Sequence, residues 1–480
     1  MYERIRGMHM SIESEQHTYN RKIIVGLLMA GAFIAILNQT LLVTALPHIM
    51  SDLNIDATKG QWLTTAFMLT NGILIPITAF LIEKFSSRAL VITAMGIFTA
   101  GTIVGAFAPN FPVLLAARII QAAGAGIMMP LMQTIFLTIF PVERRGAAMG
   151  MVGLVIAFAP AIGPTLSGWI VDSFTWRYLF YIILPISLID LVLVIMLMKN
   201  VTTLRETSLD ILSIILSSLG FGGLLYGFSS AGSDGWGNQT VLISFAVGAV
   251  SLLFFIMRQL KIKRPILEFR VFQSWTFSIT TLLGMIVFAL MIGTETILPL
   301  YTQNVRDISA FDSGLMLLPG AIAMGIMSPI IGRIFDKIGG KGLAIIGFAI
   351  LLLTSIPFTD LADDTSIPFI VIIYTVRMIG VSMIMMPLTT AGINSLPQHL
   401  IAHGTAMNNT MRQIGGSIGT AVLISVMSSS AKNASTTNPL NAVIHGMNTA
   451  FIVAALMALA GFILSFTLKR KVQKAGQPAR

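Results

Sequence analysis

Five charged side chains interrupt stretches of the chain that are otherwise apolar: Arg118, Asp190, Glu295, Arg377 and Arg412. A guanidinium in hydrocarbon costs at least about 2.5–3.5 kcal/mol on insertion scales, so each arginine must face a protein interior or a wet cavity. A carboxyl group at such a depth is costly to ionise, whereas a neighbouring arginine favours its ionised form. This competition is what a reversible proton site requires. Glu295 and Asp190 are therefore the candidate proton carriers, and Arg118 is the residue expected to set their protonation equilibrium.

Each of these residues also has a purely structural interpretation. Arg118 could anchor neighbouring helices by hydrogen bonds, and Gln121 shares its helix face one turn further on. Glu295 could lie near the surface in water, and Asp190 could pair with any polar neighbour. Arg377 and Arg412 are expected to pair across helices or to line a polar seam, as is Asn408 near Arg412. The alternative for the three is a place in a substrate cavity or a gate.

The stretches that hold these charges are long enough to cross a membrane. Of the 480 residues 55% are hydrophobic and only 50 are charged, whereas a soluble chain of this length would carry about 120 charged residues. A soluble globular enzyme is therefore excluded. Runs of about 20 mainly apolar residues predict membrane-spanning helices. Fourteen runs qualify: about 22–46, 61–82, 89–108, 112–133, 146–170, 177–198, 210–229, 240–257, 276–299, 312–335, 342–360, 367–391, 404–428 and 447–468.

The basic residues fix the expected orientation of these spans. With both termini in the cytoplasm, 23 of the 30 lysines and arginines fall in the inside segments, which obeys the positive-inside rule. The same scatter over many short segments argues against nucleic-acid binding. The chain has no cysteine, hence no disulfide or Cys-ligated metal site, and no Walker-A motif for ATP. Uphill transport would need an ion gradient.

An internal repeat with a period near 257 residues divides the chain into two related halves. IMMP occurs at 127–130 and again at 384–387, and GAAM at 146–149 has its counterpart in GTAM at 404–407. Duplicated halves with a site between them are typical of secondary transporters. The predicted organisation is a cytoplasmic segment 1–21, a six-helix bundle 22–198, two inserted helices with linkers 199–270, a second six-helix bundle 271–468 and a basic cytoplasmic tail 469–480.

Four sequence patches resemble the major facilitator superfamily, and within it the fourteen-helix drug:proton antiporters of the multidrug and lincosamide type. They are RIIQAAGAGIMMP at 118–130, GPTLSG at 163–168, WRYLFYIILP at 176–185, and the paired loops AFLIEKFSSR at 79–88 and GRIFDKIGGK at 332–341. The resemblance implies an all-α membrane protein with fourteen helices in two pseudo-symmetric six-helix bundles plus an inserted pair.

The resemblance implies export of apolar or cationic drugs, driven by the proton-motive force through alternating access. The alternatives are a transporter dedicated to one metabolite or lipid, and a non-transporting membrane sensor or scaffold. No enzyme activity and no cofactor are expected. The expected partners are small-molecule drugs, protons and the lipid bilayer, with the protein acting as a monomer. The expected location is the plasma membrane of a bacterium, a Gram-positive one.

The resemblance also assigns roles to particular residues. Gly163 and Pro164 belong to the antiporter signature of span five and are expected at a flexing or sealing surface. Span one departs from the family, because Asn38 stands where many relatives carry an aspartate. An amide does not titrate, so Asn38 cannot carry the proton, although it remains a candidate for the cavity. The two loops are expected to lock one conformation through Glu83, Lys84 and Arg88 and through Arg333, Asp336 and Lys337.

Overall fold

The computed structural model describes residues 19–202, 204, 210–434 and 438–469. Within this part the regular structure is helical, and fourteen helices are long and apolar enough to cross a membrane, as predicted. The outermost residues of the predicted terminal segments, 1–18 and 470–480, lie outside the described residues. The helices are α2 (Arg21–Asp52), α3 (Ala57–Lys84), α4 (Ser87–Ala106), α5 (Phe111–Ile139), α6 (Arg145–Ser173), α7 (Tyr178–Leu197), α8 (Ile211–Asp234), α9 (Gln239–Lys261), α10 (Trp275–Asn304), α11 (Ala310–Ile338), α12 (Gly340–Ser355), α13 (Ile367–Asn394), α14 (Ile401–Lys432) and α15 (Pro439–Ser465).

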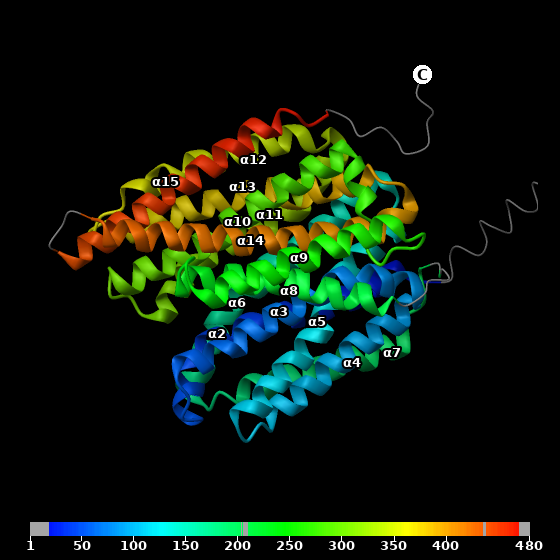
Figure 1. Ribbon diagram of the computed structural model, residues 1–480, viewed down its shortest axis with the longest axis horizontal. Helices are drawn as coiled ribbons and strands as arrows, with labels where there is room; N and C mark the ends of the chain where they lie inside the picture. The colour runs from blue at the N-terminus through cyan, green and yellow to red at the C-terminus, as the bar shows by residue number, and fades with distance from the viewer. Residues whose placement is uncertain (1–18, 203, 205–209, 435–437, 470–480) are drawn as a thin grey trace, which may run out of the picture.

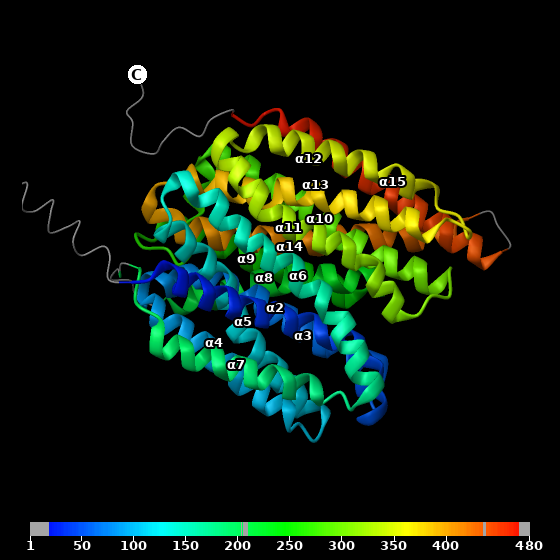
Figure 2. The ribbon, with the colours of Figure 1, turned by 180° about the vertical axis from the view of Figure 1, so that it is seen from behind.

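The helices form two bundles with an added pair between them. Helices α2–α7, coloured blue to cyan-green, lie together, and helices α10–α15, coloured green-yellow to red, form the second group (Figures 1 and 2). The bundles meet mainly where α6 packs on α11 and where α3 packs on α14. Helix α8 contacts both α3 and α14, and α9 packs on α8. The inserted pair therefore bridges the two halves along one side.

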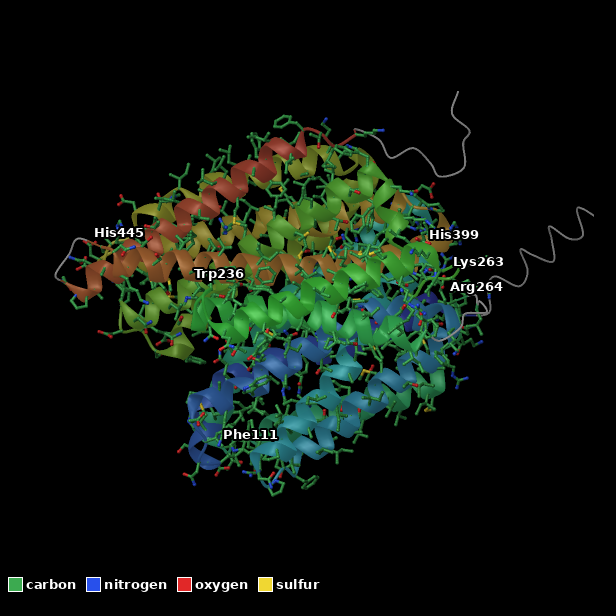
Figure 3. All side chains as sticks on the ribbon, viewed as in Figure 1. Phe111, Trp236, Lys263, Arg264, His399 and His445 are labelled. Carbon is green, nitrogen blue, oxygen red and sulfur yellow. The ribbon has the colours of Figure 1, made fainter. Side chains whose placement is uncertain are left out.

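Both halves begin and end at the same end of the bundle, which we call the terminal end. Arg21 at the start of α2 and Lys469 after α15 line one cavity there. Figure 3 places Lys263, Arg264 and His399 at this end. The positive-inside rule predicts that the terminal end faces the cytoplasm. The opposite end is called the far end below.

Helix formation follows from the demand that a bilayer places on the backbone. Each peptide group in hydrocarbon must be hydrogen-bonded within its own segment, and only long helices achieve this without partner strands. Side-chain caps complete several ends: Asn110 accepts from the Val113 amide at the start of α5, and Ser274 accepts from the Phe277 amide at the start of α10. Apolar side chains cover the outside of the bundle, such as Met196 at 72% exposure, while polar ones such as Arg118 are buried inside.

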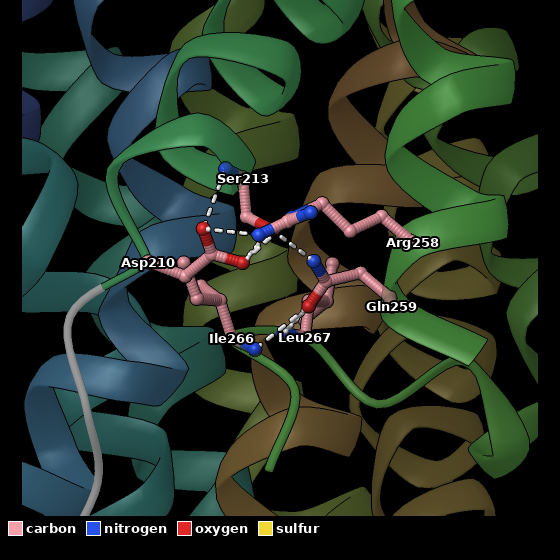
Figure 4. Close-up of polar contacts among 6 residues, drawn as sticks. All are labelled: Asp210, Ser213, Arg258, Gln259, Ile266 and Leu267. Carbon is pink, nitrogen blue, oxygen red and sulfur yellow. Dashed lines mark hydrogen bonds and ion pairs between the residues drawn. The ribbon is translucent and has the colours of Figure 1, made fainter. Parts of the chain in front are cut away.

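A polar network holds the inserted pair together at its terminal end (Figure 4). Arg258 of α9 donates two hydrogen bonds to Asp210, at 2.9 and 3.1 Å, and Asp210 caps α8. These bonds hold the pKa of the Asp210 carboxyl below its usual value. Gln259 donates to the Ser213 hydroxyl at 2.6 Å. The oxygen of the same amide accepts from the loop that leads to α10, through the backbone of Ile266 and Leu267.

Candidate functional site

Arg118 is the centre of a buried polar cluster in the N-terminal half. It is fully buried and donates to the side-chain oxygens of Asn38 at 2.5 Å and Gln121 at 2.9 Å. Gln121 passes the network on by donating to Thr102 of α4 at 2.9 Å. The Phe67 ring lies 4.2 Å from the guanidinium carbon. The cluster thus joins α2, α3, α4 and α5, and the expected shared face of Arg118 and Gln121 is confirmed.

A glycine makes this network possible. A side-chain carbon at Gly101 of α4 would lie 2.6 Å from the backbone nitrogen of Gln121, a distance that real side chains do not adopt. Only glycine therefore lets α4 approach α5 closely enough for Thr102 to reach Gln121.

Arg118 does not contact the two acidic residues that the sequence analysis proposed for it. Both of its side-chain partners are neutral amides, and its Nε and Nη2 atoms have no hydrogen-bond partner in the described part of the chain. Arg118 therefore makes no direct contact with Glu295 or Asp190 in this conformation, and its expected effect on their protonation stays a prediction. The positive charge is stabilised by amide dipoles and by the Phe67 ring.

Glu295 occupies the related position in the C-terminal half. It follows Asn38 by 257 residues, which is the repeat period. The Tyr374 hydroxyl on α13 and the Glu295 carboxyl group on α10 lie close enough to interact. Tyr374 is 2% exposed, whereas Glu295 is only partly buried. One half thus carries an amide beside a cation, and the other carries a carboxyl group beside a phenol.

Arg377 lies one turn beyond Tyr374 and serves a local role. Its Nη1 donates to the Ser355 hydroxyl at 2.8 Å and to the Leu351 carbonyl at 3.2 Å, both on α12. The side chain is fully buried. It therefore ties α13 to α12 inside its own half, which agrees with the predicted pairing across helices.

Asp190 lies apart from Arg118, against the middle of α2. A side-chain carbon at Gly31 would fall 3.1 Å from the Asp190 Oδ2, and the methionine side chains of Met95 and Met128 reach the same spot. Asp190 is 4% exposed and its Oδ2 has no hydrogen-bond partner among the described residues. Gly31 and Asn38 are seven residues apart on α2, which is about 10 Å. Asp190 is thus a second buried carboxyl group, in an apolar setting.

Amide groups join the two halves near the terminal end. Asn409 of α14 donates to the side-chain oxygen of Gln133 on α5 at 2.7 Å. Asn408 stays within its own half, donating to Thr281 at 3.4 Å and accepting from Thr389 at 3.3 Å. The sequence analysis missed Gln133, although an amide in an apolar span was a usable signal. Arg412 lies one turn beyond Asn408 and Asn409 on α14.

The small residues of α6 serve two different contacts. Near the terminal end, a side-chain carbon at Gly150 would lie 2.6 Å from the Ser328 carbonyl oxygen of α11, so the halves touch backbone to backbone. Gly163 instead faces Thr40 of α2 in the same half. A side-chain carbon at Gly314 of α11 would lie at an ordinary 3.8 Å from the Pro164 Cβ. The contact between the halves is therefore tight at the terminal end and looser toward the far end.

Two acidic residues from the predicted lock loops cross between the halves. Asp336 of α11 accepts from the backbone amides of Gly146 at 2.7 Å and Ala147 at 2.9 Å. These are among the free amides at the start of α6, where negative charge is favoured by the helix dipole. The Oε1 of Glu83 on α3 lies 3.4 Å from the Nε2 of His403 on α14. Both contacts tie the two halves together at the terminal end.

The remaining lock residues make contacts within their own half or, among the described residues, no hydrogen bond or ion pair. Arg88 donates to the Ile195 carbonyl at 2.7 Å, within the N-terminal half. The Lys84 ammonium lies 5.4 Å from the centre of the Phe80 ring. Arg333 and Lys337 are exposed. Of the residues predicted to lock one conformation, the acidic ones, Glu83 and Asp336, thus make the contacts between the halves.

A cavity of about 720 Å³ opens at the terminal end between the halves. Its wall contains five basic and two acidic side chains: Arg21, Arg145, Lys337, Lys341, Lys469, Glu143 and Asp336. No group of three or more histidine, aspartate or glutamate side chains suited to a metal ion occurs among the described residues.

Comparison with known proteins gives a consistent picture. The family model described as Major Facilitator Superfamily matches residues 28–420. The chain is 73% identical to an uncharacterized MFS-type transporter, YcnB of Bacillus subtilis, over 98% of this chain and 100% of that protein. It is 42% identical to the lincomycin resistance protein LmrB of Listeria innocua, over 93% of this chain and 96% of that protein. Among solved structures, the human organic anion transporter MFSD10 matches with a TM-score of 0.67 at 14% identity, covering 92% of this chain and 99% of that one, and so supports the fold.

Proposed function

Because the chain belongs to the major facilitator superfamily, we propose that it is a proton-coupled exporter of structurally varied, mainly apolar drug-like compounds that works by alternating access. The relatives named for lincomycin resistance, at 42–43% identity over 93% of this chain, support the substrate class. A multidrug transporter protein of Bacillus subtilis, MdtP, is 31% identical over 89% of this chain.

The observation that carries the proton coupling is the Glu295–Tyr374 pair. Glu295 is a carboxyl group inside a membrane helix, partly buried, with a phenol beside it. A phenol can donate to the ionised carboxylate and can accept from the protonated acid, so the pair suits both protonation states. The related Asn38 does not titrate, which leaves Glu295 as the proton carrier at this depth. Asp190 is the second candidate.

The transport cycle follows from which end is closed. In the present conformation Asp336 and Asn409 bridge the halves near the terminal end, and we infer that this is the state open toward the outside. Protonation of Glu295 from the outside would accompany release of the drug. Rocking of the halves would then break the bridges, expose Glu295 to the cytoplasm and let the proton leave while a new drug binds.

The Arg118 cluster has a fixed role in this scheme. The guanidinium keeps its charge, and its amide partners cannot exchange protons with it. We propose that the cluster sets the electric field of the N-terminal half and orders α2, α4 and α5 as that half moves. Arg118 would then affect the rate of the conformational change instead of carrying the proton.

The test is substrate flux in proteoliposomes under an imposed pH gradient, with a cationic dye and an uncharged antibiotic. Flux should follow the gradient in the unaltered protein and fall to the level of empty liposomes in Glu295→Gln. Asp364→Asn, in an exposed loop, is the matched control and should behave like the unaltered protein. If gradient-driven flux survives Glu295→Gln, the carrier lies elsewhere and Asp190→Asn is tested next.

The same experiment separates the proposed function from its alternatives. Movement of both compounds supports a broad substrate range. Movement of neither, in protein that is folded and correctly inserted, would favour a dedicated transporter of one metabolite or lipid, or a protein that does not transport.

A further inference from the structure

We infer that Arg412 binds an anionic group, a carboxylate, of an amphiphilic transported compound. This inference rests on the proposed function, because it assigns a substrate class to the path between the two halves. It differs from the expected preference for apolar or cationic compounds, since it adds a site for negative charge.

The first observation is that Arg412 is a buried cation without a counter-ion. It is 5% exposed, and its Nε and Nη1 atoms have no hydrogen-bond partner among the described residues. No ion pair involves it in the described part of the chain. Leaving charged donors buried and unpaired is costly, so such a group is expected to have a partner in another functional state.

Each of the other two arginines of the spans has oxygen partners for its Nη1, although its Nε and Nη2 are, among the described residues, as unpaired as the Nε and Nη1 of Arg412. Arg118 has the oxygens of Asn38 and Gln121, and Arg377 has those of Ser355 and Leu351. Arg412 has in their place the ring of Phe288 on α10, whose centre lies 5.0 Å from the guanidinium carbon. The ring leaves the in-plane N–H groups free, and these are the groups that bind a carboxylate in bidentate fashion.

Further unpaired donors lie on or beside α14, one to two turns before Arg412. Asn409, one turn away on α14, bonds to the oxygen of Gln133 on α5, which leaves the Gln133 Nε2 without a partner. The Thr405 hydroxyl, one turn before Asn409, is also unpaired. These groups come from both halves of the molecule. An excess of buried donors over acceptors at this interface is the chemistry of an anion site.

Among the described residues, no carboxyl group forms an ion pair with Arg412. Glu295 lies seven residues beyond Phe288 on α10, about 10 Å further along the helix. It also has Tyr374 as a partner. A carboxylate from outside the protein therefore fits better than a rearranged side chain.

The cavity at the terminal end supports the same sign of charge. Its wall carries five basic and two acidic side chains, and a concave surface of one sign raises the local concentration of oppositely charged molecules. Basic residues at this end also follow from the positive-inside rule. The charge of the cavity wall is therefore compatible with an anionic compound entering there, but the inference rests on Arg412.

The ligand class follows from these surroundings. The carboxylate would pair with Arg412, and the apolar body would lie against Phe288 and neighbouring apolar side chains. Rhodamine B and its ethyl ester form a matched pair of probes, because they share one aromatic body and differ in the free carboxylate.

Binding and transport of the two probes test the inference. Binding is measured by thermal stabilisation of the detergent-purified full chain, and transport in proteoliposomes. Rhodamine B should bind the unaltered protein, and Arg412→Gln should raise its Kd by about 10- to 100-fold, the loss expected for a charge-assisted pair. Binding of the ethyl ester should change less than about twofold. Arg412→Lys should restore part of the affinity, and Arg144→Gln, at an exposed arginine, is the matched control.

Several outcomes would overturn the inference. They are equal loss of both probes in folded Arg412→Gln, unchanged rhodamine B binding in that variant, and no binding to the unaltered protein. Stabilisation by inorganic phosphate equal to that by rhodamine B would show a site for small anions in general and would also overturn it. The proposed function fails separately, when binding depends on Arg412 but no probe is moved by a pH gradient.

Discussion

The two halves of this protein place different chemistry at related positions. In the N-terminal half, Asn38 accepts from Arg118 at 2.5 Å, so a neutral amide faces a permanent cation. In the C-terminal half, Glu295 pairs with Tyr374, so a carboxyl group faces a neutral phenol. The duplicated fold repeats the helices and leaves their polar contents to diverge. A pair of bundles can therefore divide the work, with a fixed charge in one and an exchangeable proton in the other.

The difference also extends to the loops. Asp336 of the C-terminal half accepts from two backbone amides of α6 in the other half. Its counterpart Glu83 contacts His403 of α14 at 3.4 Å. Each half thus reaches across to a helix start in the other, by different chemical means.

Exchanging the two residues is the strongest way to break the comparison. Glu295→Gln should abolish gradient-driven flux. Adding Asn38→Asp should fail to restore it, because an aspartate 2.5 Å from Arg118 would form an ion pair and stay ionised. Flux is measured in proteoliposomes with a pH gradient and corrected for the amount of inserted protein. Recovery in the double variant would show that the two halves are interchangeable and that Arg118 does not fix the charge state of its neighbour.

A smaller effect is expected from breaking the bridge at the terminal end. Asp336→Ala removes two hydrogen bonds to the start of α6, a loss of about 0.5–2 kcal/mol by analogy with helix caps. The closed terminal end should open about 2- to 30-fold more often. The chain has no cysteine, so a single Thr281→Cys on α10, where the native side chain is only 2% exposed, reports opening through its rate of labelling by a water-soluble maleimide.

Two further variants make this measurement specific. Lys337→Ala, the exposed neighbour of Asp336, should leave the labelling rate unchanged. Asp336→Asn should fall between, because one acceptor oxygen remains. Equal labelling in all variants would mean that the packing of α6 on α11 closes this end without the carboxylate.

The smallest effect on stability is expected from the polar contacts that join helices at the far end of each half. Asp52 accepts from the Trp176 indole at 2.9 Å and pairs with Arg177 at 2.8 Å, whereas in the other half the Tyr301 hydroxyl bonds to the Ala362 carbonyl. The hydrogen bond from Trp176, and then that from Arg177, hold the pKa of Asp52 below its usual value. The ionised carboxylate therefore stabilises the fold above about pH 3.9, the unfolded pKa, and this contribution is lost as the pH falls through the folded pKa.

Thermal unfolding in detergent measures this difference. Asp52→Asn should lower the Tm by about 1–2 °C at pH 6, since the pair is largely exposed, and the difference should vanish below the folded pKa. Tyr301→Phe should lower the Tm by an amount that does not depend on pH between 3 and 7, because neither the Tyr301 hydroxyl nor the Ala362 carbonyl titrates there. A pH-independent effect of Asp52→Asn would contradict the assigned ionic tie.

Much of the polar interior was predictable from local sequence. Arg118 had to face inward because of its charge, and Gln121 had to share its face because of the helix repeat. Both expectations hold in the structure. The partners of Glu295 and Asp336 were not predictable, since Tyr374 and Gly146 are far away in the chain and no spacing rule connects them.

The sequence by itself determined the number of spans, their order, the duplicated halves and the inserted pair. The reason is that a bilayer requires about 20 apolar residues with internal backbone hydrogen bonds, and this requirement is local. Only the tertiary structure decided which buried polar groups meet, such as Arg118 with an amide, Glu295 with a phenol and Arg412 with a ring. Helices that are apolar on nearly every side carry no pattern that fixes their rotation. Their rotation is set by close packing with neighbours, and with it the partner of each buried charge.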